Sequence, residues 1–291
     1  MIPDAFSSDA YVVARPVLRE TPVIFSVPHS GRDYPAAFLA AIALDAQAIR
    51  TSEDAFVDLL FAAAPATGAP LIVARAPRAY IDLNRACDEL DPAVIEGIAR
   101  APHNPRVSSG LGVIPRVVAN GRPIYRGKIG LREAEARIAG VWHPYHAALR
   151  ALIEESHALF GEAVLIDCHS MPHEAIEAHA RPGQPRPDVV LGDRFGAAAG
   201  REVVERVEAA FANAGLRVVR NAPFAGAYIA QAYGRPSRRQ HVVQIEIDRA
   251  LYMDEARIEP GAGFAAFRDL IAGVVAEIAV IGRGEVPLAA E

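Results

Sequence analysis

The sequence lacks most of the features that mark secreted, membrane-spanning and nucleic-acid-binding proteins. Only two of its 291 residues are cysteines, Cys87 and Cys168, and their wide separation argues against a disulfide framework. The chain carries 30 basic and 35 acidic residues, which gives a formal net charge of −5. Because nucleic-acid-binding proteins usually present a basic face, this balance argues against a nucleic-acid partner.

Long apolar runs and targeting segments are missing as well. No apolar run approaches the roughly 18 residues that a membrane-spanning helix needs. The opening stretch, MIPDAFSSDAYVV, has no basic segment followed by an apolar one, so we predict no signal peptide. These absences together predict a cytoplasmic protein without a membrane partner.

Apolar residues make up 52% of the chain, enough to bury a large core. Three apolar runs, Pro22–Val27, Pro70–Ala74 and Ala163–Ile166, predict buried strands. The spacing of apolar residues over Ala197–Ala214 and Phe264–Ile281 predicts amphipathic helices. Because strands alternate with helices, we expect an α/β fold of three layers, α/β/α, around a central, mostly parallel (mixed) sheet.

A long helical pattern covers Leu131–Phe160, and Pro144 should break or kink it. His143 and His146 flank this point. Histidines at such spacing can bind a metal ion, but a structural role or a place in a pocket wall is favoured.

Residues from about 86 to 130 are rich in Gly, Pro, Asn and Arg and predict a long loop excursion. A loop of this length is more often functional than a mere connection. No linker or internal repeat divides the chain, so we expect residues 1–291 to form a single domain, with a loose tail after residue 282.

Two of the predicted strands lead directly into a histidine. Pro22–Val27 is followed by Pro28 and His29, and Ala163–Ile166 is followed by Asp167, Cys168 and His169. In open α/β sheets, ligands bind beyond the carboxyl ends of the strands. Asp167 and His169 alternate, so on an extended chain they share one face. We therefore expect both histidines to meet a ligand at the same edge of the sheet.

A catalytic zinc site usually has three protein ligands from His and Asp or Glu. His29 and His169 are candidates, and a carboxylate from Glu53 or Asp54, just before a helical pattern that Gly68 ends, would complete the set. Adjacent side chains at a helix start lie about 100° apart, so only one of the two acids would face the metal. Simpler roles remain open, because His29 could cap a turn and Asp54 could cap a helix.

Five segments, taken in order, resemble one known family, the N-formylglutamate amidohydrolases. They are Pro28-His29-Ser30-Gly31, Ser52-Glu53-Asp54, Asp82-Leu83-Asn84-Arg85, Asp167-Cys168-His169-Ser170 and Gln244-Ile245-Glu246-Ile247. The resemblance extends over residues 23–255, and the family is related in fold to zinc carboxypeptidases, aspartoacylase and succinylglutamate desuccinylase. It implies a phosphorylase/hydrolase-like fold.

The sequence departs from the wider superfamily at one position. There, a glutamate ligand follows the first histidine by three residues, whereas this chain has Arg32. The acidic ligand must therefore come from elsewhere, and we choose Asp54 first and Glu53 second.

The resemblance implies that the protein hydrolyses the formyl amide of N-formylglutamate to formate and glutamate, the last step of one route of histidine breakdown. The expected cofactor is Zn²⁺, or another divalent metal, on His29, Asp54 and His169. Glu246 lies mid-strand among apolar residues and resembles the superfamily's general base. The alternative for Glu246 is a solvent-facing side of the strand His241–Ile247.

The resemblance also implies groups that hold the substrate. Asp82-Leu83-Asn84-Arg85, at the end of an extended piece predicted over Tyr80–Leu83, resembles a carboxylate clamp. In that clamp Arg85 would grip bidentately and Asn84 would add a donor. Arg78 would serve the same pocket or pair with Asp82. The remaining expected contacts are Arg126, for the oxyanion or a second carboxylate, and Tyr228, in a glycine-rich loop that resembles a pocket-lining loop of the family.

Three functions remain open at this point. The first is N-formylglutamate hydrolysis, and the second is a related zinc hydrolase that cleaves another N-acyl amino acid or a small peptide. The third is a non-catalytic small-molecule binding protein on the same fold. The hydrolases are favoured because a binding protein has no need of a base beside a metal.

Overall fold

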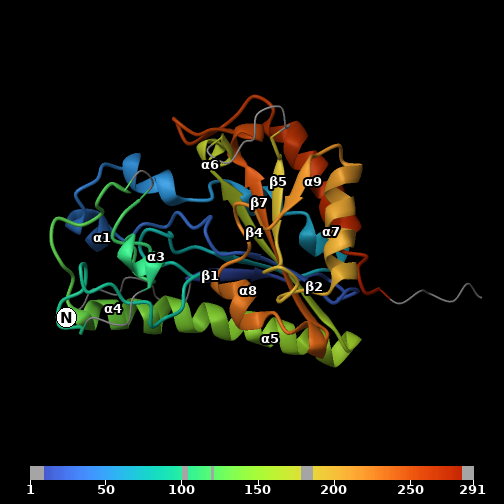
Figure 1. Ribbon diagram of the computed structural model, residues 1–291, viewed down its shortest axis with the longest axis horizontal. Helices are drawn as coiled ribbons and strands as arrows, with labels where there is room; N and C mark the ends of the chain where they lie inside the picture. Colours follow the sequence, from blue (N-terminus) through green and yellow to red (C-terminus); the bar gives the residue numbers. More distant parts are fainter. Residues whose placement is uncertain (1–9, 100–103, 119–120, 178–185, 284–291) are drawn as a thin grey trace, which may run out of the picture.

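The computed structural model describes residues 10–99, 104–118, 121–177 and 186–283. Its centre is a seven-stranded mixed sheet with strand order β1-β3-β2-β4-β7-β5-β6 (Figure 1). The strands are β1 (Tyr11–Ala14), β2 (Val23–Val27), β3 (Leu71–Ala74), β4 (Ala163–Met171), β5 (Val189–Gly192), β6 (Val218–Arg220) and β7 (Gln240–Asp248).

Strands β3, β2, β4 and β7 run parallel to one another. At one edge β1 is antiparallel to β3, and at the other β5 is antiparallel to β7 and parallel to β6. This arrangement confirms the predicted α/β class with a mostly parallel, mixed sheet.

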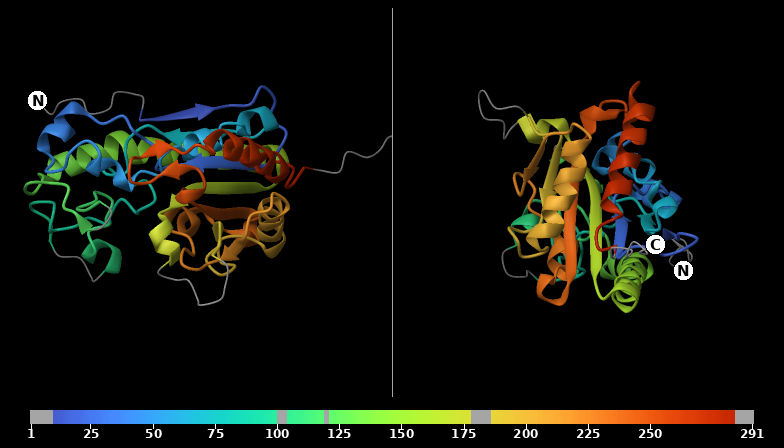
Figure 2. Two further views of the ribbon diagram at one scale, coloured as in Figure 1. Left: turned by 90° about the horizontal axis from the view of Figure 1, so that it is seen from above. Right: turned by 90° about the vertical axis from the view of Figure 1, so that its right-hand side faces the viewer.

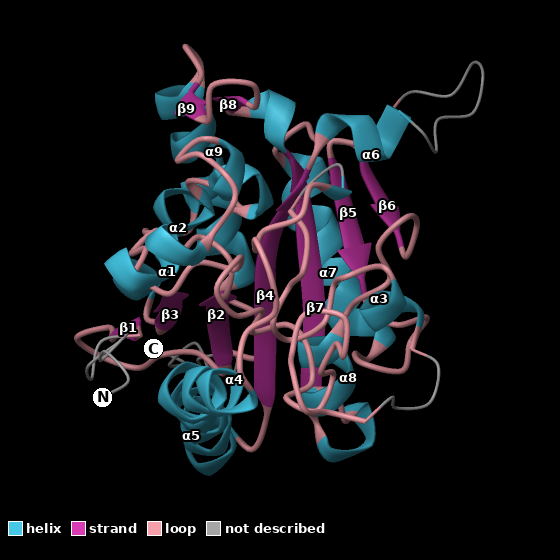
Figure 3. Ribbon diagram, turned by 90° about the vertical axis from the view of Figure 1, so that its left-hand side faces the viewer, coloured by secondary structure: helices cyan, strands magenta, loops and turns pink. Residues whose placement is uncertain are grey.

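Helices lie on both faces of the sheet, as Figure 3 shows. They are α1 (Ala36–Ala41), α2 (Val57–Leu60), α3 (Pro105–Ser108), α4 (Leu131–Arg137), α5 (His143–Phe160), α6 (His173–Glu177), α7 (Arg201–Asn213), α8 (Tyr228–Tyr233) and α9 (Phe264–Ile278). A small hairpin of β8 (Met253–Asp254) and β9 (Glu259–Pro260) follows β7. No helix in the described ranges is long and apolar enough to cross a membrane.

One face of the sheet is apolar over most of the length of its central strands. Val164, Ile166 and Cys168 of β4 lie on this face and pack into one core cluster with α2, α7 and α9. On β7 the same cluster takes every second residue from Val243 to Ile247. Helices α7 and α9 contact each other over this face (Figure 2). The alternation is what a strand buried on both sides requires, since neighbouring side chains point to opposite faces.

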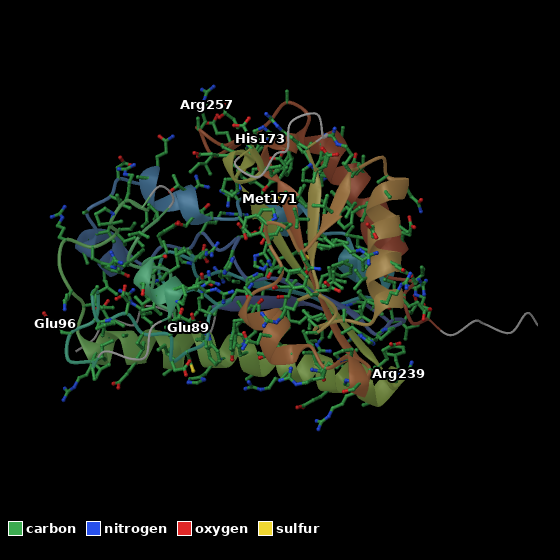
Figure 4. All side chains as sticks on the ribbon, in the orientation of Figure 1. Glu89, Glu96, Met171, His173, Arg239 and Arg257 are labelled. Carbon is green, nitrogen blue, oxygen red and sulfur yellow. The ribbon has the colours of Figure 1, made fainter. Side chains whose placement is uncertain are left out.

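The opposite face changes from apolar to polar part-way along the strands. Leu165 of β4 and Val242 of β7 belong to the core cluster that includes α5 and α8. Further along, Asp167 pairs in register with Ser26 on one side and with Gln244 on the other. The polar side chains therefore gather at the carboxyl end of the parallel strands. Figure 4 labels Met171 at that end of β4 and Arg239 at the opposite end, just before β7.

The helical pattern before Gly68 forms two short pieces rather than one helix. Phe56 has a left-handed backbone (φ 67°), α2 covers only Val57–Leu60, and a 3-10 turn covers Ala64–Thr67. The predicted stop at Gly68 is present, with φ 80°. The left-handed residue turns the chain just after Asp54, so Asp54 does not cap a helix.

No strand forms over the extended piece predicted at Tyr80–Leu83: Tyr80 and Leu83 lie in turns, and the two residues between them have no regular structure. The backbone N–H of Tyr80 donates to Pro77, and the Asp82 carboxylate accepts from the Asn84 N–H at 2.8 Å. An aspartate that bonds the backbone two residues ahead favours a turn over a strand.

The predicted break near Pro144 is confirmed as a π-helical segment, Ile138–Trp142, between α4 and α5. Proline removes the donor that would complete the regular ladder at this point. His146 is buried and lies between the Tyr233 hydroxyl (2.8 Å) and the Leu83 carbonyl (2.9 Å), whereas His143 is exposed. Burial lowers the pKa of His146 to about 3, so this histidine is neutral and structural.

The predicted loop excursion is present, with α3 and isolated bridges as its regular structure in the described parts of residues 86–130. In Figure 1 it lies above α4 and the adjoining end of α5. The tail predicted after residue 282 lies outside the described residues, apart from Arg283.

Candidate metal centre

Three side chains from separate parts of the chain meet at the polar end of the sheet. His29 follows β2, Asp54 follows the 3-10 turn Ala48–Ser52, and His169 lies in β4. The Nδ1 atoms of the two histidines are 3.1 Å apart, and Asp54 Oδ2 lies 3.0 Å from His169 Nδ1 and 3.4 Å from His29 Nδ1. All three residues are buried, and they form the one His/Cys/Asp/Glu group in the described residues that could hold a metal ion.

The spacing of these atoms fits a metal ion. A tetrahedral zinc with bonds of about 2.0–2.2 Å has its ligand atoms about 3.3 Å apart. The distances within the triangle, 3.0, 3.1 and 3.4 Å, lie close to this value. The donor set of two imidazoles and one carboxylate is also one that catalytic zinc sites use.

Carboxylates hold both histidines from behind. His29 donates from Nε2 to Asp82 at 2.8 Å, and His169 Nε2 lies 3.0 Å from Asp167. Metal-ligating histidines commonly donate their second ring N–H in this way, which sets the ring orientation and leaves the other nitrogen for the metal. Burial works to raise the pKa of Asp82, but Arg78, His29 and Arg85 outweigh it and hold that pKa well below its usual range.

Asp54 is the acid that faces the histidines, and Glu53 points away. Asp54 Oδ1 accepts from Arg249 Nη2 at 3.0 Å, which orients the carboxylate with Oδ2 toward the imidazoles. Glu53 instead accepts from the Tyr34 hydroxyl at 2.7 Å and pairs with Arg50 at 3.0 Å. The structure therefore favours the first choice made from the sequence.

The electrostatics of the triangle suit a cation. Burial favours the neutral form of Asp54, yet the hydrogen bonds from His169 and His29 outweigh it and hold the pKa of Asp54 well below its usual range. Burial likewise works to lower the pKa of His169, but Asp167 and Asp54 raise it well above its usual range. Ionised carboxylates around the imidazoles therefore favour positive charge at the centre.

Glu246 lies beside this group on β7, in register with His169 of β4. It is buried, lines the same cavity and accepts a hydrogen bond from Gln244 Nε2 at 2.8 Å. Burial raises the pKa of Glu246 to about 7, and Asp54 adds to the rise while His169 and Arg78 oppose it. The solvent-facing alternative for this residue does not hold.

Asn84 contacts protein groups of the centre that its sequence context did not imply. Its Nδ2 lies 3.2 Å from Asp167 and 3.1 Å from His169 Nε2, and its Oδ1 accepts from the Ile229 N–H at 2.7 Å. The amide thus braces the carboxylate behind His169 and ties α8 to the centre. Asn84 also lines the cavity, so its contact with a substrate carboxylate stays a prediction.

A cavity of about 530 Å³ opens over the centre. The loop excursion forms part of its wall through Leu111, Val117 and Val118, and residues 223–227 form another part. Its charged lining comprises four arginines and three carboxylates: Arg78, Arg85, Arg106, Arg249, Asp54, Asp82 and Glu246. The excess of cationic side chains favours an anionic ligand.

Comparisons with known proteins identify a family for this chain. The model of the N-formylglutamate amidohydrolase family matches residues 21–253. The chain belongs to this family. Among curated proteins, it is 33% identical over 238 residues to an N-formylglutamate deformylase of Pseudomonas aeruginosa, covering 80% of this chain and 83% of the relative. An N-formylglutamate deformylase of Pseudomonas putida is 29% identical over 80% of this chain and 82% of the relative.

Solved structures show the same relationship. The crystal structure of an N-formylglutamate amidohydrolase from Ralstonia eutropha has a TM-score of 0.88 and 36% identity, covering 94% of this chain and 98% of that one. A gene product of Agrobacterium tumefaciens, with a TM-score of 0.61 and 16% identity over 91% and 94% of the two chains, shares the fold.

Two residues that were expected to contact the substrate, Arg126 and Tyr228, do not line the cavity. Arg126 is exposed and is not among the residues that line the cavity. Tyr228 is also absent from the lining, because its ring packs against Trp142 (5.8 Å between centroids) and His146 (5.6 Å). The structure thus corrects their expected place: Arg126 lies on the surface, and Tyr228 fills space between α8 and α5.

Arg249 and Arg106 also belong to the site and were not singled out from the sequence, whereas Gln244 was part of a segment that resembles the family. Arg249 directly follows β7. A position at the end of a strand is the signal that identified His29, and the same signal could have identified Arg249. Gln244 shares the face of Glu246, which the alternation of β7 also predicts. Arg106 lies in the loop excursion, where no periodic pattern indicates which side chains face the cavity.

Proposed function

We propose that this protein hydrolyses the formyl amide of N-formylglutamate with a divalent metal ion, zinc in the first instance, on His29, Asp54 and His169. The water oxygen joins the formyl carbon, the carbon–nitrogen bond breaks, and formate and glutamate leave. A zinc ion bound there would polarise the amide carbonyl and lower the pKa of water to about 7. The related deformylase and amidohydrolase names support this substrate.

One observation carries the proposal. The triangle of His29 Nδ1, His169 Nδ1 and Asp54 Oδ2 has edges of 3.0 to 3.4 Å, and each histidine has a carboxylate behind it. Such bracing places the donors before any ligand arrives, as catalytic metal sites require. A binding protein would gain nothing from the additional buried carboxylate of Glu246 next to this triangle.

Glu246 is the general base of the proposed reaction. Its carboxylate lies in the cavity and is held by Gln244, so it can take a proton from the attacking water. It then returns that proton to the leaving nitrogen, which departs as an amine. Both transfers require a carboxyl group whose pKa lies near the working pH.

Arg78 replaces Arg126 as the cation that steadies the oxyanion. Its Nε donates to Asp82 at 3.0 Å, while among described residues its two outer nitrogens have no hydrogen-bond partner. Arg78 is close enough to Asp54 and Glu246 to interact with both electrostatically. Donors placed where negative charge develops lower the barrier to acyl transfer.

Arg85 remains the proposed partner of the α-carboxylate. Its Nε donates to the Leu111 carbonyl at 2.9 Å and its Nη1 to the Asn84 carbonyl at 2.8 Å. These bonds fix the guanidinium plane, and Nη2 has no hydrogen-bond partner among the described residues, where Arg85 lines the cavity. We further propose a cytoplasmic location and a place at the end of histidine breakdown, in one folded domain.

The test is hydrolysis by purified protein that has been stripped of metal and reloaded. Formate and glutamate are measured together after incubation with N-formyl-L-glutamate, with the stripped protein and N-acetyl-L-glutamate as controls. We expect equimolar products after reloading with zinc, and little turnover of the larger acetyl group. Absence of products with zinc, cobalt, manganese and iron would overturn the proposed function.

A further inference from the structure

One arginine of the cavity has no hydrogen-bond or ion-pair partner in the described part of the chain. Arg106 lies on α3, is half-buried and lines the cavity, yet no hydrogen bond or ion pair of its guanidinium occurs within the described residues. We propose that Arg106 binds the side-chain carboxylate of the substrate and thereby sets a preference for N-formylated amino acids with an acidic side chain. The inference rests on the proposed function and adds the residue that selects the side chain.

The other arginines of the lining are already engaged. Arg249 donates to Asp54, to the Ser170 hydroxyl at 3.0 Å and to the Thr51 carbonyl. Arg85 donates to two backbone carbonyls, and Arg78 donates to Asp82. Arg106 is thus the cationic side chain of the described lining whose whole donor edge remains available.

Arg78 and Arg106 differ in their connection to the metal centre. Arg78 donates to Asp82, which in turn holds His29, and it interacts electrostatically with Asp54 and Glu246. Arg106 lies on α3, and within the described residues its side chain has no hydrogen bond to any group of the centre. Because the α-carboxylate is attached next to the scissile nitrogen while the side-chain carboxylate is two methylenes further on, the arginine that is not bonded to the centre suits the side chain.

A chain of hydrogen bonds connects the backbone of Arg106 to the residue directly after Arg85. The Asn104 side chain accepts from the Arg106 N–H at 2.9 Å and donates to Glu89 Oε2 at 3.1 Å. Glu89 Oε1 in turn accepts from the N–H of Ala86, the residue after Arg85, at 3.0 Å; Figure 4 labels Glu89 beside α3. A guanidinium on a pre-ordered support loses less freedom when it binds a carboxylate, which favours affinity.

An anion would relieve the repulsion between these cations. Burial lowers the pKa of Arg85, Asp82 opposes this shift, and the like charges of Arg78 and Arg106 lower the pKa further. Arg106 has no carboxylate of its own to offset this repulsion in the described chain. A substrate carboxylate would supply the missing charge and match the planar fork of the guanidinium.

The experiment compares Arg106→Gln with the unaltered protein on two substrates, N-formyl-L-glutamate and N-formyl-L-glutamine, which differ only in the charge of the side chain. We expect kcat/KM for N-formyl-L-glutamate to fall roughly 10- to 100-fold, mostly through KM, as loss of a hydrogen-bonded charge pair predicts. N-formyl-L-glutamine should change less than about threefold, since a charge-assisted pair is absent from that complex. Arg106→Lys should recover part of the loss.

Arg132→Gln is the matched control, because it removes the same charge from an exposed site outside the cavity lining. Competitive inhibition by glutamate and by glutamine gives a second readout that needs no turnover, and only the constant for glutamate should weaken in Arg106→Gln. Equal losses on both substrates, or none on N-formyl-L-glutamate, would overturn the role of Arg106 while leaving the proposed function intact. Failure of the unaltered protein to hydrolyse either substrate would overturn the proposed function itself.

Discussion

The metal centre and the part of the cavity wall that carries Arg106 differ in how their charged side chains are paired. At the centre, His29 and His169 each contact Asp54 on one side and a second carboxylate on the other. On the wall, the guanidinium of Arg106 has no partner among the described side chains. The centre is therefore organised before a ligand binds, because misplaced imidazoles would lose the metal.

The wall follows a different requirement. A cation already paired with a protein carboxylate would have to give up that partner before it could bind a substrate anion. Arg106 has no such partner among the described residues, whereas Arg78 is paired with Asp82 through Nε and keeps only its two outer nitrogens without a partner there. The comparison indicates that the metal ligands must be held in fixed positions for catalysis, whereas Arg106 must keep an unpaired charge to bind the substrate.

The largest expected effect comes from removing the triangle. We expect His169→Ala and His29→Ala each to lose bound metal and nearly all activity, because two remaining ligands hold zinc weakly. Asp54→Ala should behave alike, while Glu53→Ala should keep its metal. Elemental analysis of metal per chain is the measurement, and wild-type metal content in both histidine variants would exclude the triangle as the binding site.

The next effect tests the base without disturbing the metal. Glu246→Gln keeps the shape of the side chain but cannot accept a proton, so kcat should fall by roughly 10²–10⁴. Metal content and substrate affinity should stay close to those of the unaltered protein. All three quantities are measured on one preparation; unchanged turnover would remove the base from the mechanism, and loss of metal would make Glu246 a ligand.

A smaller effect is expected from the carboxylates behind the histidines. Asp82→Asn and Asp167→Asn keep a polar group in place but weaken the hold on the ring, and we expect metal affinity to fall roughly 10- to 100-fold. Competition with a chelator of known affinity measures this change. If excess metal does not restore most of the activity, the two residues act on the reaction rather than through metal binding.

The smallest effect is expected from an arginine of the loop excursion that lies on the surface rather than in the cavity. Arg126→Gln should change kcat/KM for N-formyl-L-glutamate by less than about twofold, as is usual for exposed positions. Steady-state kinetics beside Arg106→Gln provides the comparison. A loss as large as that of Arg106→Gln would mean that Arg126 reaches the substrate after all.

Much of the fold was predictable because its signals are local. The runs Pro22–Val27 and Ala163–Ile166 are apolar without interruption and stop at polar residues, so they predicted both the strands and the place where the polar groups emerge. The helix pattern before Gly68 was misjudged, because a left-handed residue at Phe56 divides it and no periodicity signals such a turn.

The sequence by itself determined the α/β class and placed His29, His169 and Glu246 at strand ends or on one strand face, since these features follow from alternation over a few residues. Only the tertiary structure decided that Asp54 faces the histidines while Glu53 pairs with Arg50. It also decided that Arg106 and Arg249 line the cavity while Arg126 and Tyr228 do not. Those outcomes depend on how loops far apart in the chain fold across the sheet, and no local pattern carries that information.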